Sequence, residues 1–60
     1  MTIFILNKNN KTVLVGSEMK FYENIKELYQ TITNRKPNGD INELAFELID
    51  FGYSLEVIEN

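Results

Sequence analysis

The sequence contains no cysteine, no histidine and no tryptophan, and it has only one proline and one arginine. Without cysteine the chain forms no disulfide and offers no thiolate nucleophile. Without histidine it lacks the commonest general acid and base, and ordinary zinc sites depend on these same two residue types. We therefore expect a protein that is not an enzyme and that binds no cofactor and no metal ion.

Long apolar runs are also missing. The longest one, Ile3–Leu6, is far shorter than the roughly 20 residues that a membrane-spanning helix needs. No lysine or arginine precedes this run and no small-residue cleavage site follows it, so it does not resemble a secretory signal. These absences predict a cytoplasmic protein that does not associate with membranes.

The composition is that of one small folded domain spanning residues 1–60. Hydrophobic residues make up 43% of the chain, which is normal for a globular domain and too high for a disordered one. The net charge of −3 disfavours general nucleic-acid coating. In so short a chain the free energy gained by burial and that lost by ordering nearly cancel, so a partner or a second copy would stabilise it.

Two strands are predicted near the N-terminus, at Thr2–Asn7 and Lys11–Val15, because both segments are rich in β-branched side chains. Asn9 and Asn10 between them favour a tight hairpin turn, since asparagine tolerates the left-handed backbone that such a turn requires. The hairpin therefore forms the first two strands of a sheet.

A two-residue turn also predicts the register of this hairpin. One face then carries two apolar pairs, Leu6 with Val13 and Phe4 with Val15. The other face carries three apolar side chains: Ile3, Ile5 and Leu14. Since both faces are apolar, both are expected to be covered.

A first helix is predicted from Glu18 to about Asn34, with Ser17 as its N-cap. Its apolar residues recur at spacings of three and four, which places them on one stripe: Phe21, Tyr22, Ile25, Leu28, Tyr29 and Ile32. The segment Arg35–Gly39 contains proline and glycine and is expected to end this helix.

A second helix is predicted to begin after Asp40. Asp40 and Glu43 form a capping-box pattern, and the expected core stripe follows: Ile41, Leu44, Ala45 and Leu48. Gly52 favours a left-handed end, and Tyr53–Glu59 alternates apolar and polar residues like a third strand. The fold class is therefore α+β in the order β-β-α-α-β, with two helices packed on one face of a three-stranded sheet. The neighbour of the third strand stays open.

The second helix carries four carboxylates, Asp40, Glu43, Glu47 and Asp50, at spacings of 3, 4 and 3 residues, which predicts an acidic row along one side. Such a row has a spacing similar to that of nucleic-acid phosphates. A plain solvated face with capping roles for the first two residues explains the same pattern.

Phe46 lies outside the core stripe of the second helix and is flanked by carboxylates, an arrangement typical of an anchor in protein–protein contacts. We therefore hypothesise a non-enzymatic interaction protein that binds another protein through an acidic helix face: Glu43, Phe46, Glu47, Asp50 and Glu56.

Two alternatives remain. Four cations are expected at one pole of the domain, which would suit a small, dimeric nucleic-acid-binding regulator: Lys8, Lys11, Arg35 and Lys36. The two-faced apolar hairpin would instead suit an obligate homo-oligomer with a structural role.

In its overall sequence properties the chain is similar to small proteins of phages and mobile elements, including inhibitors of host polymerases and of CRISPR nucleases. The likeness rests on size, acidity, the absence of catalytic motifs and a bias toward Asn, Ile and Lys, whose codons are AT-rich. It implies an inhibitor of a host nucleic-acid-handling protein, of the anti-defence or host-takeover type. It assigns no role to any individual residue.

Overall fold

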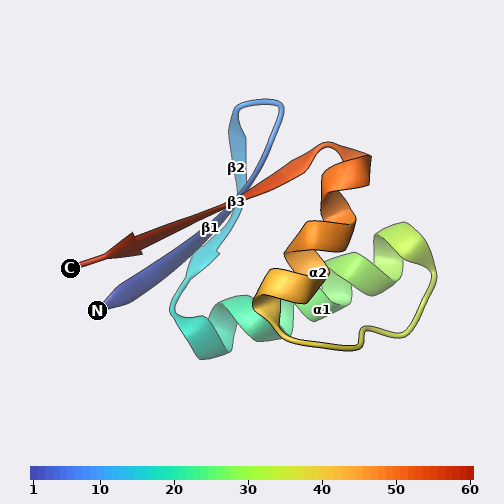
Figure 1. The fold of residues 1–60 in the computed structure, drawn as a ribbon, viewed down its shortest axis with the longest axis horizontal. Coiled ribbons are helices and arrows are strands. Elements are labelled where there is room, and N and C mark those ends of the chain that lie inside the picture. The colour runs from blue at the N-terminus through green and yellow to red at the C-terminus, as the bar shows by residue number, and fades with distance from the viewer.

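The computed structural model describes residues 1–60 and confirms the β-β-α-α-β order of an α+β fold. The elements are β1 (Thr2–Lys8), β2 (Lys11–Gly16), α1 (Glu18–Thr33), α2 (Ile41–Leu48), the 3-10 turn η1 (Ile49–Phe51) and β3 (Tyr53–Glu59). Both helices pack on the same side of the sheet, and the two chain ends lie side by side (Figure 1). Neither helix combines the length and the apolar character that crossing a membrane requires.

The sheet is antiparallel throughout and has the strand order β2-β1-β3. The third strand therefore pairs with β1 rather than with β2, which places β1 in the middle. Both β2 and β3 are edge strands with one side unpaired. This arrangement decides which backbone groups remain free for a partner.

The hairpin turn forms as predicted, but the register beyond it does not. Asn9 and Asn10 have φ angles of 54° and 64°, the left-handed conformation that a type I′ turn needs at both positions. A β-bulge after the Asn7–Thr12 pair then shifts the register by one residue.

The predicted pairs Leu6–Val13 and Phe4–Val15 are therefore wrong. Leu6 pairs with Leu14, Ile5 with Val15 and Phe4 with Gly16. The shift turns Leu14 toward the helices, where it packs against the core, and leaves Val15 57% exposed on the opposite face. A larger side chain thus fills the core position beside Leu6.

The core lies between the helices and the sheet. Its nine buried residues include every predicted core residue of α2: Leu6, Phe21, Ile25, Tyr29, Ile41, Leu44, Ala45, Leu48 and Tyr53. Three further side chains of the predicted α1 stripe are partly buried against it: Tyr22, Leu28 and Ile32. The apolar stripes that helical spacing predicted for the two helices are confirmed.

The helix ends follow the predicted signals with one exception. Asp40 Oδ1 accepts the backbone N–H of Glu43 at 2.9 Å, and Glu43 Oε1 accepts that of Asp40 at 3.0 Å, which completes the capping box. Gly52, with a φ of 90°, ends η1 in the left-handed region. Ser17 occupies the N-cap position of α1, but its side chain makes no capping hydrogen bond.

Candidate functional site

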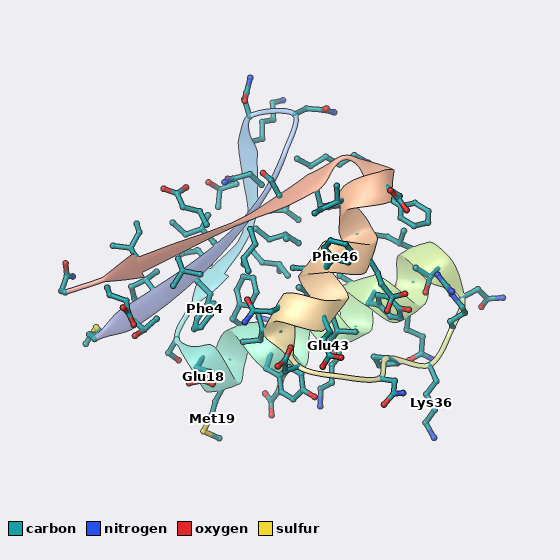
Figure 2. The ribbon with its side chains drawn as sticks, viewed as in Figure 1. Phe4, Glu18, Met19, Lys36, Glu43 and Phe46 are labelled. Atoms are coloured by element: carbon teal, nitrogen blue, oxygen red, sulfur yellow. The ribbon has the colours of Figure 1, made fainter.

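The outward side of α2 and η1 exposes three large apolar side chains that we call the apolar patch: Phe46, Ile49 and Phe51. Their exposed fractions are 73%, 54% and 43%, respectively. Phe46 stands in the middle of α2 (Figure 2). The inward side of the same helix is fully occupied by the core, so the patch is not a continuation of it.

Two shallow hollows show that the apolar patch is continuous. All three patch residues line a hollow together with Arg35, Glu47 and Asp50. Phe46 and Ile49 also line a groove of about 380 Å³ between α2 and β3, with these residues: Asn42, Ala45, Tyr53, Ser54 and Leu55. The patch therefore extends from the surface of α2 to the edge of the sheet.

Helical spacing predicts that Phe46 lies outside the core stripe, and its exposure confirms this. The exposure of Ile49 and Phe51 was not predicted. The signal for Ile49 was present, since a residue three positions after Phe46 lies on the same helix face. The exposure of Phe51 had no local signal. Phe51 lies in a 3-10 turn, whose residue spacing differs from that of the α-helix before it, so the helical spacing of α2 does not predict which way Phe51 faces.

The four carboxylates of the second helix do not form an unbroken row of free charges. In the capping box, the carboxylates of Asp40 and Glu43 each accept a hydrogen bond from the other residue's backbone N–H. Glu47 Oε1 accepts the Tyr29 hydroxyl at 2.7 Å and lies 3.7 Å from Arg35 Nη2. Only Asp50 is exposed and makes no side-chain hydrogen bond or ion pair. Three of the four carboxylates therefore have partners within the domain, and Asp50 is the one that has none.

The contact between Tyr29 and Glu47 joins α1 to α2 and changes the acidity of the phenol. The hydrogen bond to the Glu47 carboxylate raises the pKa of Tyr29, and burial of the ring raises it further. Arg35 acts in the opposite direction through its positive charge. The net shift is upward because the hydrogen bond requires the protonated hydroxyl.

We expect this shift to be visible in alkaline solution. The folded protein keeps the Tyr29 proton where the unfolded chain, with an ordinary tyrosine pKa of about 10, has lost it. The hydrogen bond between Tyr29 and Glu47 therefore contributes its full stabilisation below about pH 10, the unfolded-state pKa. This stabilisation is lost as the pH rises through the higher folded-state pKa of Tyr29.

Tyrosinate absorbance followed against pH measures the effect. One of the three tyrosines of the wild type should ionise late, and this late phase should be missing in Tyr29→Phe. If the titration curve of Tyr29→Phe kept the late phase and only its total amplitude fell by one tyrosine, Tyr29 would not be the tyrosine with the raised pKa.

The four predicted nucleic-acid contacts are not gathered at one pole. Lys8 and Lys11 flank the hairpin turn at the top of Figure 1, whereas Lys36 lies in the α1–α2 loop at the lower right of Figure 2. Lys8 Nζ lies over the Tyr53 ring at 4.9 Å, and Arg35 contacts Glu47 and Tyr29. The expectation of a shared pole is therefore wrong, because the loop that carries Lys36 lies away from the hairpin turn (Figures 1 and 2).

A second groove, of about 540 Å³, opens where the first turns of α1 and α2 meet. Phe4, Met19 and Tyr22 form part of its wall, and the Tyr22 hydroxyl donates to the Gly39 carbonyl at 2.8 Å. Its two carboxylates, Glu18 and Asp40, lie at helix N-termini, where negative charge complements the helix dipole. That structural role accounts for both.

Comparison with known proteins finds no matching family model, no matching curated protein and no matching solved structure. Function is therefore inferred from the surface itself, and its most distinctive feature is the apolar patch beside the free edge of β3.

Proposed function

We propose that this chain is a non-enzymatic protein-binding module whose contact surface is the apolar patch on α2 and η1. The observation that supports this most directly is the 73% exposure of Phe46 on a helix whose remaining apolar residues, apart from Ile49 just beyond it, are buried. Exposed aromatics that are surrounded by smaller apolar contacts and a polar rim are the usual anchors of protein interfaces.

The energetic reason is the apolar area that the patch leaves in water. Burying an exposed phenylalanine side chain contributes about 2–3 kcal/mol, and Ile49 and Phe51 add to this on the same surface. None of the three patch residues belongs to the core behind α2, so that free energy is not recovered within the domain. A partner that supplies a complementary hollow would recover it.

The finer hypothesis is that the partner is a cationic nucleic-acid-handling protein, which the chain inhibits by covering its basic groove. Its support is the net charge of −3 and two exposed carboxylates: Asp50, which lies beside the patch, and Glu56, on the open face of the sheet. Charges at the rim of an interface mainly accelerate association and make it sensitive to salt. Glu43 and Glu47 are assigned no direct contact, because their carboxylates have partners inside the domain.

A second candidate is self-association through the sheet face that the helices leave uncovered. Strand alternation places four apolar side chains on that face: Ile3, Ile5, Val15 and Ile58. Val15 and Ile58 are exposed, so a second copy packed there would bury them.

Capture of a partner from a nuclease-treated lysate of an AT-rich bacterium tests the proposal. We expect one protein to be retained in a one-to-one ratio by the wild type and lost with Phe46→Ser, since removing an anchor of this kind weakens binding about 30-fold or more. Met19→Ser is the matched control, because Met19 is 79% exposed but lies on α1, outside the patch.

The variants separate the candidates. Equal capture by Phe46→Ser and the wild type would rule out the apolar patch. Loss of capture in Asp50→Lys combined with Glu56→Lys, at low salt only, would support the cationic partner. A molecular mass that rises with concentration in both the wild type and Phe46→Ser would favour self-association through the open sheet face.

A further inference from the structure

The hydrogen bonds at the chain ends reveal which backbone groups of β3 are free. The Met1 ammonium donates to the Asn60 carbonyl and the Asn60 N–H donates to the Met1 carbonyl, each at 3.0 Å. This mutual bonding makes Met1 and Asn60 a hydrogen-bonded pair, and such pairs alternate along an antiparallel ladder.

Counting from that pair assigns the whole strand. Ser54, Glu56 and Ile58 direct their N–H and C=O groups toward β1. Leu55, Val57 and Glu59 direct theirs outward, where no strand follows.

The two edges of the sheet differ in protection. Natural edge strands are usually protected by charged side chains, lysine above all, by proline or by a β-bulge, which discourage pairing with other chains. β2 has Lys11 and the bulge, whereas β3 is seven residues long, regular and free of lysine and proline. The edge of β3, whose only protection is its glutamates, is also the one beside the apolar patch.

The groove between α2 and β3 lies beside the first three residues of β3. Leu55 lines it, and its side chain lies on the helix face of the sheet; Ser54, on the opposite face, lines it as well. Helix α2 packs over β3, whereas α1 packs over β1 and β2, so the side of α2 that faces away from α1 lies at the outer side of β3. A strand added to β3 would therefore place alternate side chains above Phe46 and Ile49.

Charge specifies the other side chains of such a strand. β3 carries two exposed carboxylates, Glu56 and Glu59, and no cation. A residue opposite Glu56 would lie on the open face of the sheet, where lysine or arginine would pair with that carboxylate. A second copy of β3 brings only further carboxylates, so it lacks this complementarity.

We propose that β3 accepts an extended segment of another protein by strand addition, and that this segment alternates apolar residues with lysine or arginine. This proposal rests on the proposed function and names the kind of partner. Main-chain hydrogen bonds to Leu55 and Val57 provide affinity, while the groove and Glu56 select the side chains.

The test uses the full chain and a short blocked peptide, acetyl-Lys-Val-Lys-Val-Lys-Val-amide, followed by amide NMR and hydrogen exchange. In the free protein the amides of Leu55, Val57 and Glu59 should exchange rapidly, and the peptide should protect them. The same peptide with N-methylated valines lacks the N–H groups that would pair with β3. It should bind at least about tenfold more weakly. A Glu-Val peptide should not bind.

Val57→Pro tests the edge from the side of the protein. It removes an outward N–H and no β1–β3 hydrogen bond, so the fold should persist by circular dichroism while peptide binding falls about tenfold. Ile58→Pro is the matched control, because it removes an inward N–H and should destabilise the sheet.

Three results would overturn strand addition. They are protection of amides outside β3, equal binding of the N-methylated peptide, and no binding of any peptide. Amide protection that rises with protein concentration alone would show that a second copy occupies the edge.

The lysate capture separates this proposal from the proposed function. If Val57→Pro still captures the lysate partner but Phe46→Ser does not, strand addition fails while the proposed function stands. Capture by both variants would remove both proposals.

Discussion

Replacing Phe21 by alanine is expected to remove a large share of the protein's free energy of unfolding. Phe21 is fully buried in α1, and its ring lies 5.5 Å from that of Phe4 on β1. Truncating a buried phenylalanine costs about 3–5 kcal/mol, because apolar contact is lost and a cavity remains. The total stability of a domain of this size is only about 3–9 kcal/mol, so the loss removes a large share of it.

Thermal and urea unfolding followed by circular dichroism measure this effect. We expect Phe21→Ala to lower Tm by at least about 15 °C. Phe46→Ala is the matched control, since it removes the same side chain from an exposed position and should change stability by less than about 0.5 kcal/mol. Equal losses in the two variants would show that the core does not lie where the structure places it.

Gly39→Ala is expected to be the most damaging change to the backbone. Gly39 has a φ of 116°, which side-chain-bearing residues rarely adopt, and an added Cβ would lie 2.8 Å from Glu43 Oε1. That oxygen accepts the Asp40 N–H, so moving it breaks half of the capping box. Backbone strain and the weakened cap together should cost about 2–4 kcal/mol.

Gly16→Ala is the control for this substitution. Gly16 does not have a positive φ, and the nearest atom to an added Cβ is 3.7 Å away. We expect it to leave the urea midpoint unchanged or to raise it, since alanine reduces the entropy of the unfolded chain. The role assigned to Gly39 would be falsified if Gly39→Ala unfolded at the same urea concentration as Gly16→Ala.

The surface contacts have effects of a different kind. The ion pair of Arg35 and Glu47 is solvent-exposed and contributes little by itself. Its importance is that it holds Glu47 against α1 together with the Tyr29 hydroxyl. A partner that contacts the Glu47 carboxylate must therefore share it with Tyr29 and Arg35, whereas Asp50 has no such partners within the domain.

The elements that the sequence determined by itself are those whose causes are local. The type I′ turn follows from two adjacent asparagines, and the capping box from residues three positions apart. The buried stripe of α2 follows from helical spacing. The exposure of Phe46 belongs here too, because it lies outside that stripe.

Tertiary structure alone decided the features that depend on residues distant in the chain. The place of β3 beside β1 leaves its outer edge free, and the bulge at the hairpin exchanges Val13 for Leu14 in the core. Tyr29 and Glu47 are 18 positions apart and meet only because α1 packs on α2. Local propensity carries no information about such contacts, since their free energy exists only once the helices and the sheet have assembled.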